Sequence, residues 1–418
     1  MELIIHRGAH QIGGNCLEIR YRDAAILVDV GLPLDSNSDE PLETHQPQPL
    51  FQDIRHGGKR IDGVLLSHAH MDHYGLARLL PERIPIYCGQ ATADLIGITA
   101  SISRDKRTSP SFHTFQTGKV FGIGPFSIKP YLVDHSAFDA HAFLISAGGK
   151  HLFYTGDFRS HGRKAGTIER LMKNPPGVDV MVIEGTMLGP RSQEAHLTEK
   201  QLEEEFLRVI NETSGIVLVT AASQNIDRLV TIYKAARRAG RRFVIDFYTA
   251  EILEKLGKFA RVPQPSWPCI RVCYPQRLAK WFESMGLTDI LKQQRKNGIS
   301  WGAVGGAEGR TTMLMRPKFL TDIKDHLTLE GATWIYSMWQ GYLEKDKAFD
   351  ELRAYLQERG VRTEMLHTGG HAGLTDLMKL VDAVNPKVVI PIHSSHPEML
   401  QTHTANVRLA NDGEVIAF

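Results

Sequence analysis

Short apolar runs of four to eight residues, separated by Gly, Pro or Asp, fill the first 190 residues of the chain. Runs of this length that are rich in Ile, Val and Leu are typical of β-strands, because a helix needs a longer segment with apolar residues three and four positions apart. Few long helical segments separate them, so they predict a sheet-rich, layered domain. The runs lie at 15–21, 24–30, 63–67, 85–88, 126–133, 141–146, 151–155 and 179–184.

The pattern changes after about Gly189, where helical periodicity alternates with short apolar runs. Thr198 and Gln201 form a capping-box pattern at the start of a helix. A strand at 216–220 is then followed by a helix that Gly240 ends. Strand, helix, strand implies right-handed parallel pairing, so we expect a separate α/β unit here. Residues 255–315, rich in Pro, Trp and Gly, receive no assignment. Beyond them we expect strands at 333–337, 363–367 and 387–393 and helices at 345–358 and 375–384.

Composition limits the class of protein. The 418 residues suffice for roughly two to three domains, and 49 Lys and Arg against 47 Asp and Glu exclude a polycation or an acidic solvating chain. A nucleic-acid enzyme with a local basic groove stays open. No apolar run reaches the ~18 residues of a membrane span, and the first residues indicate a strand rather than a signal peptide. Four cysteines without a C-x-x-C pair indicate neither a disulfide framework nor a thiolate zinc site. We therefore expect a cytoplasmic protein with no membrane partner.

The densest group of potential metal ligands is His68-Ala69-His70-Met71-Asp72-His73, directly after an apolar run. Neutral imidazole and carboxylate are the ligands that suit Zn²⁺ and related divalent ions. On a loop that leaves a strand, alternate side chains can converge on one point, which a regular helix would not allow for all four. The segment therefore predicts a metal site rather than a polar turn with incidental histidines.

The H-x-H-x-D-H pattern resembles the signature of the metallo-β-lactamase superfamily, an αββα sandwich with a dinuclear metal site. That family has further ligands downstream, each at the end of a strand. Here Asp134-His135 and Gly156-Asp157 resemble two of its later motifs. The resemblance implies that His135 is a metal ligand and that Asp157 bridges two metal ions.

Three later segments resemble motifs A, B and C of the β-CASP nucleases, the nucleic-acid branch of this superfamily. They are Glu184-Gly185-Thr186, Thr368-Gly369-Gly370-His371 and Pro391-Ile392-His393. The resemblance covers nearly the whole chain and is strongest to bacterial and archaeal ribonuclease J-type enzymes. It implies an α/β fold in which a metallo-β-lactamase αββα sandwich (1–192, completed by 351–418) carries an inserted β-CASP cap domain (193–350). Motif B departs from the family, which usually has Ser-Gly or Ser-Ala before the histidine.

The resemblance also implies roles for individual residues. One metal ion would be held by His68, His70 and His135, and the other by Asp72, His73 and His393, with Asp157 between them. The ions would be two divalent cations, Zn²⁺ first and Mn²⁺ as the alternative. At ~3.5–4 Å apart they share a hydroxide at neutral pH and stabilise the charge that builds on phosphorus oxygens. Asp72 also counts among the catalytic residues, with His371 as general acid for the leaving oxygen and Glu184 as the group that orients His371.

Contacts to nucleic acid are expected from loops whose free amides can face an anion. These loops supply Ser223, Asn225, His367, Thr368 and Gly369 as candidate phosphate-binding residues. Aromatic platforms for bases could come from Trp267, Trp301, Trp334 or Trp339, although burial in the core is expected for most of them.

The implied activity is hydrolysis of phosphodiester bonds in single-stranded RNA, by an endonuclease, a 5′-to-3′ exonuclease or both. Two alternatives stay open: a DNA-directed nuclease of the same branch, which would act on single-stranded DNA, and a catalytically silent scaffold of a processing complex. The chain ends soon after His393, so we expect the C-terminal domain through which ribonuclease J-type enzymes commonly dimerise to be absent. A homodimer or a larger nuclease complex is left open.

Overall fold

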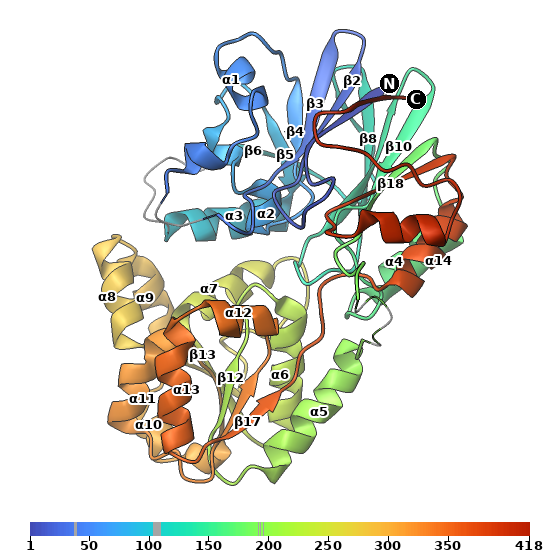
Figure 1. Ribbon diagram of the computed structural model, residues 1–418. Helices are drawn as coiled ribbons and strands as arrows, with labels where there is room; N and C mark the ends of the chain where they lie inside the picture. The colour runs from blue at the N-terminus through green and yellow to red at the C-terminus, as the bar shows by residue number, and fades with distance from the viewer. Residues whose placement is uncertain (37–39, 103–109, 191, 193, 195) are drawn as a thin grey trace. The chain divides into compact units, whose positions relative to one another are not determined.

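The computed structural model describes residues 1–36, 40–102, 110–190, 192, 194 and 196–418 (Figure 1). The chain forms two compact units. The first comprises Met1–Ala100, Arg104–Ala195 and Gly370–Phe418, and the second comprises His196–Gly369 with Ser101–Ser103. Within the described part of the chain, no helix combines the length and the apolar character needed to cross a membrane.

The first unit is built on two sheets. One contains β1 (Glu2–Arg7), β2 (Cys16–Tyr21), β3 (Ala24–Val30), β4 (Gly63–Leu65), β5 (Ile86–Gly89), β6 (Phe112–Phe115) and β19 (Val415–Ala417), in the order β19-β1-β2-β3-β4-β5-β6. The other contains β7 (Phe121–Ile123), β8 (Phe126–Leu132), β9 (His141–Ala147), β10 (Lys150–Tyr154), β11 (Val180–Glu184) and β18 (Val388–Ile392), in the order β18-β11-β10-β9-β8-β7. The strands predicted from the apolar runs are therefore confirmed, most within one or two residues at each end.

The two sheets pack face to face, and alternation along the strands shows why. Leu152 and Tyr154 on β10 belong to the core between the sheets, whereas Phe153 between them belongs to a second core on the outer face. That outer core is completed by Leu377 and other apolar residues of α14 (Leu374–Val384) and by α4 (Ala165–Lys173). Strands with both faces buried are apolar throughout, which explains the continuous apolar runs of the sequence.

Helices α1 (Leu50–Arg55), α2 (Met71–Tyr74) and α3 (Gln90–Ser101) accompany the seven-stranded sheet, and α4 and α14 cover the six-stranded one (Figure 1). The expected αββα sandwich is thus confirmed.

One buried carboxylate stands out on the seven-stranded sheet. Glu18 accepts hydrogen bonds from Arg20, from Lys59 at 2.6 Å and from His6 at 2.7 Å. Burial raises the pKa of Glu18, but these three bonds outweigh it and lower the pKa to about 2.

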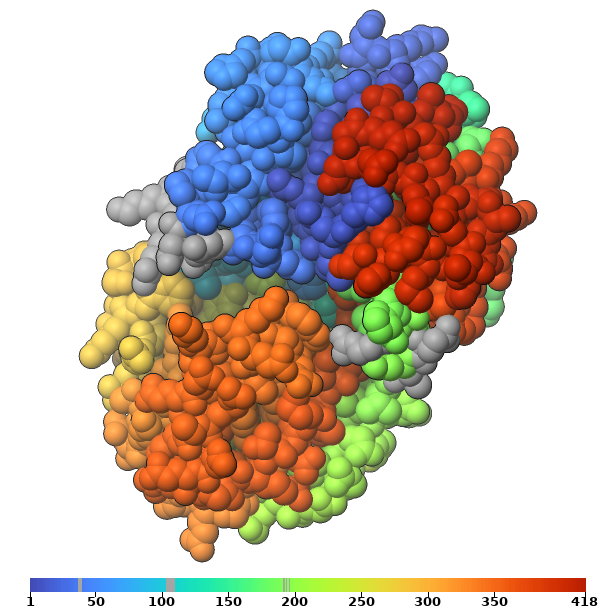
Figure 2. Space-filling view, in the orientation of Figure 1, coloured from blue at the N-terminus to red at the C-terminus, as the bar shows by residue number. Residues whose placement is uncertain are grey.

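The end of the chain completes the first unit. Strand β18 pairs in parallel with β11, and β19 pairs antiparallel with β1. Figure 2 shows the C-terminal segment, in red, lying against N-terminal residues in dark blue. Residues more than 350 positions apart in the sequence therefore share one sheet, and both sheets depend on the return of the chain.

The second unit is a parallel α/β layer, as expected from its sequence. Its sheet contains β12 (Val217–Thr220), β13 (Arg242–Asp246), β14 (Ile270–Cys273), β15 (Thr311–Leu314), β16 (Thr333–Tyr336) and β17 (Arg362–Met365), in the order β14-β13-β15-β12-β16-β17. The helices are α5 (Glu199–Glu212), α6 (Ile226–Arg238), α7 (Phe247–Leu256), α8 (Gln276–Ser284), α9 (Thr288–Gln294), α10 (Trp301–Gly305), α11 (Leu320–His326), α12 (Gln340–Lys345) and α13 (Ala348–Glu358).

Local signals in this unit match the structure. Thr198 and Gln201 make the predicted capping box at the start of α5. A buried ion pair joins α5 to α6, where the guanidinium of Arg228 lies 3.1 Å from the carboxylate of Glu199.

The return to the first unit falls after Gly369 rather than after residue 350. The physical reason is that β17 pairs with β16 and so extends the sheet of the second unit.

Candidate metal centre

The H-x-H-x-D-H segment lies in the first unit, where His68 and His70 are on the loop after β4 and Asp72 and His73 are in the short helix α2. Two neighbouring loops hold it in place. The amide of Asn15 donates to the carbonyl oxygen of Asp72 at 3.1 Å, and the amide of Leu32 donates to that of Met71 at 2.9 Å. A Cβ atom at Gly31 would lie only 1.7 Å from the Asp72 carbonyl oxygen. Glycine at position 31 therefore allows the end of β3 to approach the ligand loop this closely.

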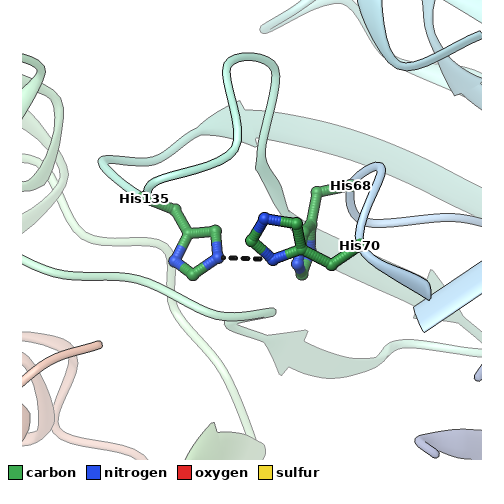
Figure 3. Close-up of side chains that lie close together, drawn as sticks. All are labelled: His68, His70 and His135. Carbon is green, nitrogen blue, oxygen red and sulfur yellow. Dashed lines mark hydrogen bonds between the residues drawn. The ribbon is translucent and has the colours of Figure 1, made fainter. Parts of the chain in front are cut away.

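Three histidines form the first cluster of this centre. Figure 3 shows the rings of His68, His70 and His135 turned toward one another. Nε2 of His135 lies 3.2 Å from Nδ1 of His70, and one ring nitrogen from each histidine lies within 4.8 Å of the others. His135 comes from the loop after β8, so the structure brings together the three residues that the resemblance implied for one metal ion.

The second cluster contains Asp72, His73 and His393, and its potential ligand atoms also lie within 4.8 Å of one another. Nε2 of His393 lies 3.3 Å from Oδ2 of Asp72, and Nε2 of His73 lies 3.9 Å from the same oxygen. His393 follows β18 and has a φ of 53°, an unusual conformation for a residue with a side chain. These are the three residues implied for the other metal ion.

Asp157 lies between the two clusters. Its Oδ2 atom is 3.1 Å from Nε2 of His73 and 3.8 Å from Nε2 of His68. Its Oδ1 atom and Nε2 of His68 are buried, and neither has a hydrogen-bond partner in the part of the chain that the structure describes. Buried polar atoms are normally paired. Two such atoms facing a set of imidazoles and carboxylates fit the coordination of divalent cations.

The electrostatics of the centre support the same conclusion. Burial and neighbouring histidines lower the pKa values of His68 and His135 well below the usual range, and burial lowers that of His70 to about 4. These imidazoles are neutral, as metal coordination requires. Burial also lowers the pKa of His73, but Asp157 and two further carboxylates outweigh it and raise that pKa well above the usual range. The carboxylates thus favour a positive charge at this position.

Hydrogen bonds on the far side of the rings orient the histidines. Nδ1 of His73 lies 2.7 Å from the carboxylate of Asp29, and Nδ1 of His393 lies 2.7 Å from the hydroxyl of Thr186. Nδ1 of His135 lies 2.5 Å from the carbonyl oxygen of Gly370. In known metal sites such partners set the tautomer and direction of the ligand. Sequence reasoning missed these contacts, although an aspartate within the apolar run 24–30 was a usable signal for Asp29.

Motif B departs from the family at Gly369, where serine is usual, and the next residue, Gly370, is closely surrounded. A Cβ atom at this position would lie 2.7 Å from the hydroxyl oxygen of Ser136 and 3.0 Å from Cε1 of His135. Any side chain at position 370 would need the His135 loop to shift. Glycine is therefore the residue that fits the present arrangement.

His371 and Glu184 lie beside the two clusters. Nδ1 of His371 is 3.0 Å from Oε2 of Glu184 and 3.7 Å from Oδ2 of Asp157. Glu184 is itself held at the end of β11, where the amide of Phe158 donates to its Oε1 atom at 2.8 Å. Burial lowers the pKa of His371, but Glu184 and Asp157 outweigh it and raise the pKa to about 9. The structure therefore brings together the two residues assigned to proton transfer, whose roles stay a prediction.

The candidate phosphate-binding residues all lie in the second unit, and most have internal hydrogen bonds. The hydroxyl of Ser223 lies 2.6 Å from that of Thr249, and the side chain of Asn225 caps α6. The Thr368 hydroxyl donates to the carbonyl of Leu197 at 2.7 Å. His367 is exposed, and Gly369 is half-buried. Their contact with phosphate stays a prediction.

Known proteins share this architecture. A family model described as a β-lactamase superfamily domain matches residues 26–219. Ribonuclease J of Mycobacterium tuberculosis is 26% identical to this chain over 96% of the chain and 70% of that protein. Ribonuclease J of Sinorhizobium meliloti is 22% identical over 94% and 69%, and the protein called probable RNase MJ4 of Methanocaldococcus jannaschii is 21% identical over 94% and 93%.

A solved structure shows the same fold over the full length. The crystal structure of a protein of unknown function from Enterococcus faecalis V583 matches with a TM-score of 0.79 and 22% identity, covering 99% of each chain. The chain thus contains a region that matches the β-lactamase superfamily domain, and over nearly its whole length it is similar to proteins named ribonuclease J.

Proposed function

We propose that this chain is a metal-dependent phosphodiesterase that cleaves single-stranded RNA. The observation that carries the proposal is the pair of three-residue clusters on either side of buried Asp157. Six ligand positions from three separate segments of the chain meet there, with ring nitrogens and carboxylate oxygens turned toward one another. A catalytically silent scaffold would have no need of a complete set.

The clusters are suited to hold two divalent cations. One would be bound by His68, His70 and His135, the other by Asp72, His73 and His393, with Asp157 contacting both. When bound, two such cations supply an activated water at neutral pH and neutralise charge that develops on phosphate oxygens. Zn²⁺ suits a site rich in imidazole, and Mn²⁺ is the alternative.

The protein's own proton-transfer group is His371. Glu184 accepts the hydrogen bond from its Nδ1 atom at 3.0 Å and so keeps a proton on that nitrogen. The ring then has Nε2 available to donate a proton to the 3′-oxygen that leaves the phosphorus. General acid catalysis of this kind contributes typically 10²–10⁴-fold to rate.

RNA as the substrate is supported by the relatives that are named ribonuclease J. The histidine at position 393 supports the same choice, because it completes the ligand set of the RNA-directed branch that the sequence resembles. The loops that carry Ser223, Asn225, His367, Thr368 and Gly369 are the proposed phosphate contacts.

The test compares two variants. His393→Ala is expected to lose one metal equivalent and most turnover, because it removes a ligand. His371→Ala is expected to keep both equivalents and to cleave RNA ~10²–10⁴-fold more slowly. Metal content by mass spectrometry and cleavage of labelled RNA are measured on the same preparations. Wild-type cleavage by His393→Ala contradicts the ligand assignment, and metal loss in His371→Ala contradicts its role as the acid.

A further inference from the structure

One tryptophan of the second unit differs from the other four in its exposure. The structure describes all five tryptophans, and Trp339 is the one with a large exposed fraction, 43%. Trp334 and Trp301 are buried in the core. Trp267 packs on Tyr233 with 5.3 Å between ring centroids, and Trp281 is half-buried beneath Lys318. Packing therefore explains four of the tryptophans and leaves Trp339 without a role in the core.

Trp339 lies where parallel α/β sheets bind ligands. It follows β16 by three residues and precedes α12, so it lies at the carboxyl end of the parallel sheet of the second unit. Ser223 and Asn225 follow β12, and Thr368 follows β17, at the same end. In open sheets of this type, ligands bind outside the carboxyl ends of the strands. The exposed ring is thus on the same edge as the loops proposed to bind phosphate.

The indole is held in place rather than free to rotate. A Cβ atom at Gly341 would lie 2.3–2.5 Å from three carbons of its six-membered ring, so the ring rests directly on the glycine backbone. Tyr342 packs against it edge-on, with ring centroids 5.2 Å apart and planes at 90°. The hydroxyl of Tyr336 donates to the Trp339 carbonyl at 3.2 Å. A ring fixed by its neighbours loses little entropy when a flat ligand stacks on it.

The loop that carries Trp339 is tied to the loop after β17. The buried guanidinium of Arg228 donates to the carbonyl of Ser337 at 2.9 Å and to that of Thr368 at 3.1 Å. Lys345 adds a cation 5.7 Å from the centre of the indole. A positive charge beside an aromatic face, on the same edge as the loops proposed to bind phosphate, is the combination that binds a base together with its phosphate.

We infer that Trp339 is a stacking platform for an unpaired base of the nucleic-acid substrate. The inference rests on the proposed function and adds to it a reason for preferring single strands, because a base in a duplex has no free face to offer. Stacking tolerates any base, so the platform favours single-stranded nucleic acid as a class rather than a particular sequence.

The test measures affinity separately from cleavage. In the His371→Ala background, binding of a short 5′-phosphorylated oligoadenylate is followed through fluorescence anisotropy and through quenching of tryptophan emission. Trp339→Ala is expected to weaken binding about 10- to 100-fold, and Trp339→Phe is expected to keep most of the affinity. Gly341→Ala places a methyl group where the indole ring now lies and so displaces the ring. Its affinity is expected to lie between those of the two Trp339 variants. Phe259→Ala is the matched control.

Phe259 is a similarly exposed aromatic residue, at 41%. It follows α7, which runs back from the carboxyl end of β13, so it lies at the opposite end of the sheet. Its removal should leave affinity unchanged. An abasic strand of the same length should bind Trp339→Ala and the parent equally. Unchanged affinity of Trp339→Ala for oligoadenylate, or an equal loss on the abasic strand, overturns the inference and favours a role such as a protein contact.

Failure of the inference and failure of the proposed function give different results. Trp339-dependent binding without any RNA cleavage by the wild-type chain supports the platform and contradicts the nuclease. Cleavage of RNA with affinity independent of Trp339 supports the nuclease and contradicts the platform.

Discussion

Replacement of Asp29 by asparagine tests how the protein orients one of its proposed metal ligands. The buried carboxylate accepts four hydrogen bonds. Its Oδ2 atom faces Nδ1 of His73 at 2.7 Å and the hydroxyls of Tyr154 at 2.5 Å and Ser67 at 2.8 Å, and its Oδ1 atom accepts from the amide of Ser67 at 2.8 Å. An amide has one acceptor oxygen, so Asp29→Asn loses at least one of these bonds and the negative charge behind His73.

The expected cost follows from these contacts. A buried hydrogen bond to a charged group is worth about 1.5–3 kcal/mol. Variants of the residues that orient metal ligands typically lose 10- to 100-fold in metal affinity, which corresponds to about 1.4–2.8 kcal/mol. Both estimates agree, so we expect the site of Asp72, His73 and His393 to bind metal 10- to 100-fold more weakly in Asp29→Asn. The site of His68 and His70 should change little.

The assay is a competition titration with a chromogenic chelator, which reports the two sites as separate transitions. Tyr154→Phe is the matched control, because it removes one donor to Asp29 but keeps the contact between Asp29 and His73. It should lose about 1 kcal/mol of unfolding free energy and retain its metal affinity. Wild-type affinity at both sites in Asp29→Asn, with the protein folded by circular dichroism, would refute the reasoning.

Three further predictions concern other contacts. The pKa of Glu18 in the folded protein is about 2, below the ordinary 4.5. Its ion pairs therefore contribute their full share of the unfolding free energy above pH 4.5, and this share is lost as the pH falls toward 2. Glu18→Gln should therefore cost about 3 kcal/mol in urea unfolding at pH 7 and progressively less below pH 4.5. Thr186→Val removes the hydrogen bond to His393 and should weaken metal binding at the site of Asp72, His73 and His393 about 10-fold in a metal titration. Equal metal affinities of the variant and the wild type would contradict this. Arg228→Ala leaves Glu199 without its buried cation and should lower stability by about 3–5 kcal/mol, and a loss below 1 kcal/mol would show that the pair contributes little.

Much of the fold follows from local patterns in the sequence. The apolar run 24–30 coincides with β3, and the capping box at Thr198 marks the start of α5. The stretch 255–315 received no assignment because several of its elements are short and Pro, Trp and Gly residues lie between them. Strand β14 has four residues and helix α10 has five, too few for a period to be recognised. The boundary at residue 350 was wrong for a different reason. Nothing in β17 itself tells which sheet it joins, since that depends on a partner strand far away.

The candidate site likewise contains residues that the sequence could identify and residues that only the fold brings together. The sequence could name the candidate ligands that the structure brings together, because four of them lie within His68-Ala69-His70-Met71-Asp72-His73 and the rest follow recognisable motifs, and their binding of metal stays a prediction. Asp29 and Thr186 could not be assigned as orienting residues, because their partners His73 and His393 are brought to them only by the tertiary fold. The exposure of Trp339 is likewise a property of the folded chain, since nothing local separates it from the buried Trp334.

The most direct test of the central claim is product analysis on matched single strands of RNA and DNA. Both carry a 5′ phosphate and a 3′ label, and the protein is supplied with Zn²⁺ or Mn²⁺. The account predicts cleavage of the RNA, either at internal positions or stepwise from the 5′ end, and loss of that cleavage in His371→Ala. Intact RNA after incubation with protein that binds both metal equivalents would contradict it.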